Sequence, residues 1–150
     1  MTRFRGLSNH NIDSKGRLII PARFKELIKD GGRPGVMVSK MDKCLVAYPF
    51  AEWEKIEERI LELAERSDAM RRFRRVFIGG AFECFCDKQD RILIPPSLRD
   101  YAGLNKEISL VGVLDHFEVW ARDSWEKENA RCDQDMQEED VRLQISRLGL

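Results

Sequence analysis

The sequence predicts an α+β protein made of two copies of one small unit. The first observation is a repeated phrase: residues 13–21 read DSKGRLIIP and residues 87–95 read DKQDRILIP, 74 positions further on. The second is the same order of strand, helix, two strands and helix in each half. The third is size. A chain that is 43% hydrophobic can build a core, but halves of about 75 residues would be marginal alone and are expected to share one.

Each copy of the phrase predicts a tight polar turn, a short strand and the start of a helix. Asn, Asp and Gly in residues 11–16 favour tight loop geometry. Residues 18–20 are all apolar, which predicts a strand buried on both faces. Pro21 suits the first position of a helix, where its missing N–H costs nothing. The apolar stripe and terminating glycines of this helix are Phe24, Leu27, Ile28, Gly31 and Gly32, and the second copy repeats the order with residues 92–94, Pro95, Leu98, Tyr101 and Gly103.

Two further strands, joined by a short turn, are predicted in each half. Asp42-Lys43 and Asp115-His116 supply the turns. These strands are too short to form an independent sheet in either half. They are expected at residues 36–39 and 45–48 in the first half and at residues 108–114 and 117–120 in the second.

Helices are predicted between the halves and at the end of the chain. Ser67 and Asp68 interrupt the helical pattern, and Ser67 can cap the helix that follows. From Ser124 onward the apolar stripe is thin, which predicts a solvated helix or a frayed tail. The helix at residues 51–66 is expected to bury Trp53, Ile56, Ile60 and Leu63, and the helix at residues 69–77 is expected to bury Met70, Phe73 and Phe77.

The repeated Asp-x-x-x-Arg resembles the hairpin loop of the SpoVT-AbrB superfamily, whose modules are swapped hairpins. With FRG at residues 4–6 and RRFRRVFIGGAFEC at residues 71–84, the chain more narrowly resembles the MraZ family of bacterial DNA-binding transcription regulators. The resemblance runs from about Phe4 to Trp125. It implies two tandem swapped-hairpin modules, related by a pseudo-twofold axis, whose short strands share one core with flanking helices. The expected divisions are a first module at 7–53, a helical connector at 54–80, a second module at 81–124 and an acidic helical or frayed tail at 125–150.

Charge is unevenly distributed along the chain. The 26 basic and 26 acidic residues give a net charge of zero, which counts mildly against nucleic-acid binding. Residues 122–150 hold eight acidic and five basic side chains. In residues 1–25, by contrast, Asp13 is the single acidic residue, and a basic region of this kind permits a phosphate-binding face. Its basic residues are Arg3, Arg5, Lys15, Arg17, Arg23 and Lys25.

The first turn has two compatible interpretations. Lys15 and Arg17 can lie against DNA phosphates. Alternatively the turn is structural, with Asp13 paired to Arg17 and Gly16 taking a positive φ. The local charge and the family resemblance favour contact with double-stranded DNA. The residues expected to make this contact are Arg17 and Lys15, with support from Arg3, Arg5 and Arg23.

The second turn is expected to serve folding more than binding. Asp90 stands where the first copy has Gly16, and Gln89 stands where it has Lys15. Asp tolerates left-handed geometry, so the turn can survive. Because Asp87 and Asp90 offset the nearby cations, Asp87 and Arg91 are assigned to the turn, and a DNA contact by this copy stays open.

A second basic cluster lies between the repeats. It can pair with acidic residues of the preceding helix or of a neighbouring subunit, and the resemblance to ring-forming proteins favours this interpretation. A second-line DNA contact stays open. The cluster consists of Arg71, Arg72, Arg74 and Arg75.

The sequence offers little support for a metal site or for catalysis. His10 occupies the repeat position equivalent to Cys84, but buried thiols acting as small apolar side chains are the simpler interpretation of Cys84 and Cys86. Neither His10 nor His116 belongs to a recognisable nucleophile–base arrangement. We therefore expect no enzyme activity, no metal and no cofactor. The four cysteines lack a disulfide framework, and no apolar stretch is long enough to span a membrane.

The sequence thus favours a cytoplasmic, nucleoid-associated transcription regulator that forms a homo-oligomer and reads short direct repeats in a promoter. A ring-shaped oligomer and the promoter of a cell-division and cell-wall gene cluster are implied by the resemblance alone. The alternative is an oligomeric scaffold that binds another protein and no DNA. The zero net charge and the acidic tail favour this alternative.

Overall fold

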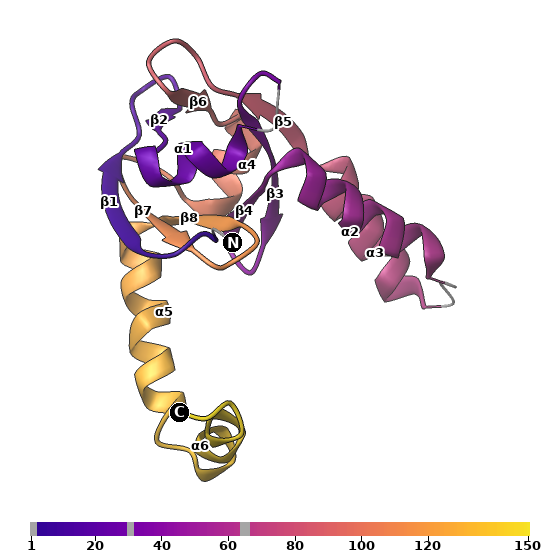
Figure 1. The fold of residues 1–150 in the computed structure, drawn as a ribbon, viewed down its shortest axis with the longest axis vertical. Helices are drawn as coiled ribbons and strands as arrows, with labels where there is room; N and C mark the ends of the chain where they lie inside the picture. The colour runs from indigo at the N-terminus through magenta and orange to yellow at the C-terminus, as the bar shows by residue number, and fades with distance from the viewer. Residues whose placement is uncertain (1–2, 30–31, 64–66) are drawn as a thin grey trace.

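The structure, a computed structural model, describes residues 3–29, 32–63 and 67–150. Both halves run through the same series of elements (Figure 1). The first half contains β1 (Leu7–Asn11), β2 (Arg17–Ile19), α1 (Ala22–Ile28), β3 (Gly35–Met41), β4 (Cys44–Tyr48) and α2 (Phe50–Glu62). After α3 (Asp68–Gly79), the second half contains β5 (Phe82–Phe85), β6 (Arg91–Leu93), α4 (Pro96–Ala102), β7 (Glu107–Gly112), β8 (Phe117–Ala121), α5 (Arg122–Asp135) and α6 (Glu139–Ser146).

The two halves exchange strands within one antiparallel sheet of order β1-β7-β8-β4-β3-β5. β1 of the first half pairs with β7 of the second, and β5 of the second half pairs with β3 of the first. β4 and β8 pair at the centre. Replacing each strand by its counterpart in the other half gives the same order in reverse, as a pseudo-twofold axis requires. The predicted α+β architecture of two swapped-hairpin units is therefore confirmed, whereas the boundaries between modules stay a prediction.

β2 and β6 form a separate two-stranded ribbon, here called the β2–β6 ribbon. Arg17 lies opposite Leu93, and Ile19 lies opposite Arg91. Leu18, the middle residue of β2, faces the core, but Ile19 and Leu93 are 54% and 55% exposed. The prediction that residues 18–20 are buried on both faces is therefore wrong at Ile19, because the ribbon is covered on one face only.

The main core lies between the sheet, the β2–β6 ribbon, α1 and α4. Three aromatic rings at its centre come from both halves. Phe24 of α1 stacks on Phe117 of β8 with 5.0 Å between ring centroids, and Phe4 contacts both rings at 5.3 and 5.7 Å. Because neither half contains this cluster alone, the two halves are expected to fold as one unit.

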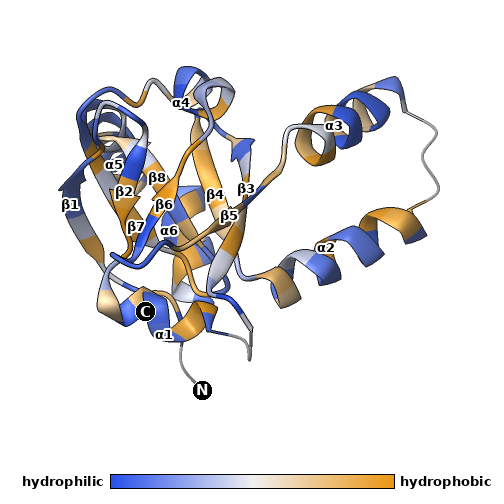
Figure 2. Cartoon of the chain, turned by 90° about the horizontal axis from the view of Figure 1, so that it is seen from above, coloured by the Kyte–Doolittle hydropathy of each residue, from blue (hydrophilic) through white to orange (hydrophobic). Residues whose placement is uncertain are grey.

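α2 and α3 form an arm that projects from the sheet (Figure 2). At its root, Trp53 and Phe77 are buried with 5.1 Å between ring centroids, as the sequence predicts. Ser67 caps α3 by accepting a hydrogen bond from the Met70 N–H at 3.3 Å, which confirms the predicted cap. Leu63 and Met70 are 54% and 42% exposed, so their predicted burial is wrong. α2 ends at Glu62, and the last residues of its predicted range, 64–66, lie outside the described residues.

Other differences from the predicted elements follow from local sequence. β1 is not predicted, because Leu-Ser-Asn-His-Asn carries no run of β-branched residues; tertiary pairing with β7 makes it a strand. β7 ends at Gly112, and Leu114 lies in the following turn with φ +68°. Tyr101 of α4 is 41% exposed, and its hydroxyl accepts a hydrogen bond from the Lys43 N–H at 3.0 Å.

The tail predicted at 125–150 is largely formed by α5 and α6, neither of which has a buried residue. Figure 1 shows α5 leaving the sheet at the end away from the β2–β6 ribbon.

Within the described residues, no helix combines the length and the apolar character that crossing a membrane requires.

We expect Phe117→Ala to lower the free energy of unfolding by about 3–5 kcal/mol, because a fully buried ring shared by both halves is lost. Leu61→Ala, which truncates a side chain that is 69% exposed, is the control and is expected to cost about 0.5 kcal/mol or less. Chemical denaturation monitored by tryptophan fluorescence and circular dichroism measures both. Two separate transitions in the wild type would contradict a shared core.

Candidate nucleic-acid interface

The first Asp-x-x-x-Arg turn is closed by one carboxylate. Asp13 Oδ1 accepts hydrogen bonds from the Lys15 and Arg17 N–H groups at 3.0 and 2.8 Å, and Asp13 Oδ2 accepts one from Arg17 Nε at 2.7 Å. The hydrogen bond from the Arg17 backbone, with further ones from the Arg17 side chain and the Lys15 backbone, holds the pKa of Asp13 below its usual value although desolvation opposes the shift. The bond to Arg17 uses Nε and leaves the two Nη amino groups available for other acceptors.

The second turn repeats this geometry bond for bond. Asp87 Oδ1 accepts hydrogen bonds from the Gln89 and Arg91 N–H groups at 2.8 and 3.0 Å, and Asp87 Oδ2 accepts one from Arg91 Nε at 2.9 Å. Asp90 adopts φ +61° where Gly16 adopts φ +91°. The expectation that an aspartate can replace the glycine of this turn therefore holds.

Each turn is supported by a helix of the other half. Arg99 of α4 lies against the first turn, where its Nε donates to the Ile94 carbonyl at 3.0 Å and leaves no room for a side chain at Gly16. Lys25 of α1 forms an ion pair with Asp90 of the second turn. Lys25 and Arg99 are 74 positions apart, so the repeat offset alone could have identified them as equivalent residues.

The β2–β6 ribbon presents both arginines on one face. Arg17 and Arg91 lie diagonally across the ribbon, and their side chains are 33% and 26% exposed. Figure 1 shows both turns at the same end of the molecule. The two turns and the residue that supports each of them, Arg99 and Lys25, bring together six cations and three carboxylates, namely Lys15, Arg17, Lys25, Lys88, Arg91 and Arg99 against Asp13, Asp87 and Asp90.

The other basic residues of the N-terminal region lie elsewhere. Arg3 and Arg5 precede β1, whose five residues span about 15 Å and separate them from the first turn. Arg23 lies against this end of β1, where Nε donates to the Arg5 carbonyl at 3.2 Å and Nη2 donates to Ser8 Oγ at 2.8 Å. The six-cation cluster therefore contains Lys15 and Arg17 but not Arg3, Arg5 or Arg23.

The arginine cluster of α3 belongs to the arm. Arg71 forms an ion pair with Asp68 of the same helix. Arg72 and Arg75 are exposed, and Figure 1 shows α3 projecting away from the two turns. Together with Arg74, these residues form a basic surface separate from the β2–β6 ribbon.

The residues considered for a metal site lie far apart. His10 is on β1 and Cys84 is on β5, which are opposite edges of the six-stranded sheet. Burial raises the pKa of the Cys84 thiol to about 12, so the neutral thiol is strongly favoured. Within the described residues, no group of three His, Cys, Asp or Glu side chains has the arrangement of a metal site.

His116 lies in a small polar cluster at the β7–β8 turn. Its ring stacks on Tyr48 with 4.5 Å between centroids, and Nδ1 and Nε2 lie 2.7 Å from Asp115 and 3.6 Å from Glu118. Burial lowers the pKa of His116, but hydrogen bonds to Glu118 and Asp115 outweigh this effect and raise the pKa above 6.5. The cluster joins β8 to the end of β4.

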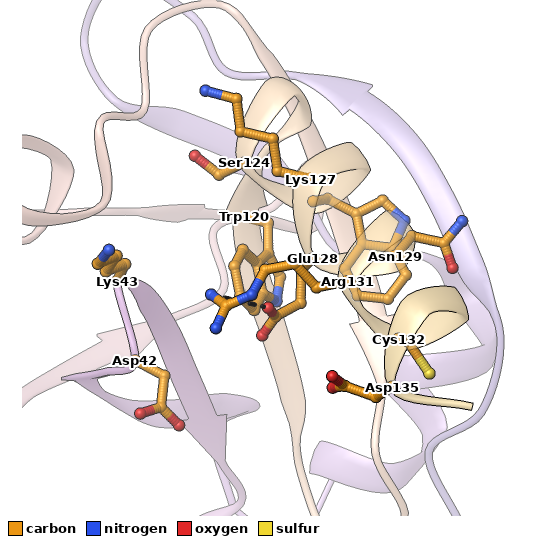
Figure 3. A pocket seen from close by; sticks show the side chains of 11 residues that line it. Asp42, Lys43, Trp120, Ser124, Lys127, Glu128, Asn129, Arg131, Cys132 and Asp135 are labelled. Carbon is orange, nitrogen blue, oxygen red and sulfur yellow. Dashed lines mark ion pairs between the residues drawn. The ribbon is translucent and has the colours of Figure 1, made fainter. Parts of the chain in front are cut away.

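A surface groove beside α5 also lacks a catalytic arrangement. It lies between α5 and the β3–β4 turn, has a volume of about 860 Å³ and has Trp120 and Trp125 among its lining residues. Figure 3 shows its charged side chains, with Asp42 and Lys43 on the turn and Arg131 paired with Glu128 on α5. Both cations and carboxylates line the groove, and no histidine does.

Comparison with known proteins identifies the family. Residues 3–76 and 77–145 each match the family described as "MraZ protein, putative antitoxin-like". The transcriptional regulator MraZ of Desulforapulum autotrophicum is 56% identical over 147 residues, which cover 98% of this chain and 99% of the relative. The proteins of the same name from Desulfosudis oleivorans and Pelotomaculum thermopropionicum are 49% identical over 147 residues and 48% identical over 123 residues, with 98% and 82% of this chain and 99% and 83% of the relatives covered.

The family match and these relatives place the chain among transcription regulators. The chain belongs to the MraZ family, with one family repeat in each half.

We expect Gly16→Ala to lower the free energy of unfolding by at least about 1–2 kcal/mol, because φ +91° is unfavourable for a residue with a Cβ. The added Cβ would also meet the Ile94 carbonyl oxygen at 2.9 Å. Gly32→Ala is the matched control, since nothing lies within 4 Å of a Cβ there. Equal stability of the two variants in urea denaturation would contradict this account of the turn.

We expect the contribution of His116 to stability to be present below pH 6.5 and to be lost as the pH rises through its raised folded-state pKa. The reason is that the folded protein binds this proton more tightly than the unfolded chain does. The stability difference between wild type and His116→Gln should therefore be larger at pH 6 than at pH 9. An NMR titration that gives a pKa of 6.5 or lower for His116 would refute the assignment.

Proposed function

We propose that this transcription regulator binds double-stranded DNA through the outward face of the β2–β6 ribbon and the two turns beside it. The observation that carries the proposal is the position of Arg17 and Arg91 on one face, each held by an aspartate through Nε. An arginine fixed in this way has lost much of its rotamer freedom, so less entropy is lost when its Nη groups bind a phosphate or a base.

The dimensions and charge of this surface support DNA as the ligand. The major groove of B-DNA, about 12 Å wide, admits a two-stranded ribbon. Lys15 and Lys88 are exposed in the two turns, within reach of phosphates on either side of such a groove. The zero net charge of the chain does not oppose this role, because the tail carries three more carboxylates than cations.

Both turns contribute in this proposal, which differs from the sequence-based expectation for the second turn. The negative charge of Asp90 offsets that of Arg91 less than the sequence suggests, because Asp90 is paired with Lys25. The side-chain hydrogen bond to Asp90 raises the pKa of Lys25 although desolvation opposes the shift, so Lys25 stays cationic at neutral pH. The Nη groups of Arg91 are then as available for contact with DNA as those of Arg17.

We further propose that the protein acts as a homo-oligomer, in keeping with the ring that the family resemblance implies. The arm carries exposed apolar side chains at Leu61, Leu63, Met70 and Val76. Trp53 of α2 is covered by α3. Its counterpart in the second half, Trp125 of α5, lines an open groove. The arginine cluster of α3 and the acidic tail on one subunit suit head-to-tail contact with further copies.

Such an oligomer would bind several short repeats at once. One ribbon of three-residue strands contacts little DNA, so each additional subunit raises the effective concentration of the next. Direct repeats about ten base pairs apart present the same face of the helix to successive subunits. On this proposal the protein is cytoplasmic, is associated with the nucleoid and acts at the promoter of a cell-division and cell-wall gene cluster.

The competing function is an oligomeric scaffold that binds another protein and no DNA. The exposed apolar side chains of the arm favour it, since such surfaces commonly mark protein contacts.

The test is binding to duplexes with short direct repeats at helical-turn spacing and to a scrambled duplex, at several salt concentrations. We expect Arg17→Ala and Arg91→Ala each to weaken binding at least about tenfold and to reduce the salt slope by about one, the change expected for one lost phosphate contact. Arg142→Ala, which removes an exposed cation from the tail, should leave binding unchanged.

Sedimentation and thermal unfolding of the same variants separate the alternatives. Loss of DNA binding with the oligomer and the folded state intact supports the proposal. Wild-type protein that binds neither duplex at low salt would instead favour the scaffold. Loss of stability with normal DNA binding would assign the arginines to the turns alone.

A further inference from the structure

Ile19 and Leu93 are aliphatic side chains that lie exposed on the outward face of the β2–β6 ribbon. They are 54% and 55% exposed, while Leu18 and Ile92 beside them are each 1% exposed. Arg17 lies opposite Leu93, and Ile19 lies opposite Arg91. The outward face of the β2–β6 ribbon therefore has arginines on one diagonal and aliphatic side chains on the other.

Both copies of the repeat carry an aliphatic residue at this position, although other parts of the turns differ between them. A strand with one covered face normally alternates apolar and polar residues. Packing in this subunit does not account for the apolar residue at the outward position, because more than half of each side chain remains exposed. Exposed apolar groups rimmed by cations indicate a contact surface for an anionic ligand that also has apolar features.

We propose that Ile19 and Leu93 contact thymine C5-methyl groups in the major groove of the DNA that Arg17 and Arg91 bind. This inference rests on the proposed function and adds a source of sequence preference to it. The thymine methyl is the apolar group that base pairs present in the major groove, and aliphatic side chains recognise it. The arginines anchor the ribbon to DNA, and the aliphatic pair favours thymine at specific positions.

The register sets the spacing of the two contacts. Diagonal neighbours on one face of an antiparallel pair lie about 7–8 Å apart, which corresponds to about two base-pair steps at roughly 3.4 Å each. The pseudo-twofold axis between β2 and β6 relates Ile19 to Leu93. The two thymines are therefore expected on opposite strands, about two base pairs apart, within the site of a single subunit.

The experiment removes the methyl group alone. A preferred duplex is first selected from a random-sequence library with wild-type protein, and deoxyuridine then replaces thymidine one position at a time. We expect two positions, on opposite strands, at which the substitution weakens wild-type binding about fourfold, the effect of one buried methyl group. The double variant I19A/L93A should bind the thymidine duplex more weakly and show no further loss with deoxyuridine at these positions.

Leu7→Ala is the matched control, because it truncates a strand residue that is 51% exposed on β1, outside the ribbon. It should keep the wild-type sensitivity to deoxyuridine. The inference would be overturned if I19A/L93A and wild type were equally sensitive to deoxyuridine, or if wild type were insensitive to it at every position. In both cases, salt-dependent binding to DNA would leave the proposed function standing. A change in oligomeric state of I19A/L93A would assign the face to a second copy of the chain and also overturn the inference. Absence of binding to any duplex would overturn both proposals.

Discussion

The exchange of strands between the two halves is the constraint on which the rest of this structure depends. β1 takes its ladder hydrogen bonds from β7, and β5 takes its ladder hydrogen bonds from β3, so each edge strand depends on the other half. The three-residue strands β2 and β6 pair with each other. Short strands of this kind are marginal in isolation. The aromatic cluster of Phe4, Phe24 and Phe117 also takes rings from both halves, so the sheet and the core form together.

The same exchange creates the candidate DNA-binding surface. Pairing β2 with β6 brings together two turns that are 74 residues apart in the chain and places Arg17 and Arg91 on one face. It also places α4 beside the first turn and α1 beside the second. Each turn has a different neighbour from the other half. Arg99 occupies the space beside Gly16 in the first turn, and Lys25 neutralises Asp90 in the second. In the sequence, Asp90 in place of Gly16 suggests that the second turn has a weaker DNA-binding role than the first. In the structure, Asp90 is instead paired with Lys25.

The two halves diverge outside this shared framework. After β4, the chain continues into the arm, where α3 returns to cover Trp53. After β8, it continues into a tail whose helices bury no residue. Basic residues are concentrated around the turns and on α3, and acidic residues are concentrated on α2 and in the tail. A net charge of zero therefore describes the sum of these regions and not any one surface, which is why composition alone is a poor guide to the partner of this protein.

The sequence by itself determined the repeat, the turns, most of the helices and the internal strands, because these depend on local signals. Asp13 and Gly16 act within a few residues, and Trp53 and Phe77 follow helical periodicity. β1 could not be predicted in this way, because its backbone bonds come from a partner about 100 residues away. Only the tertiary structure decided that Ile19 faces outward, that Lys25 and Arg99 each support the turn of the other half, and that Arg3, Arg5 and Arg23 lie apart from Arg17. These features depend on which strands pair, and periodicity along one chain does not identify the partner strand.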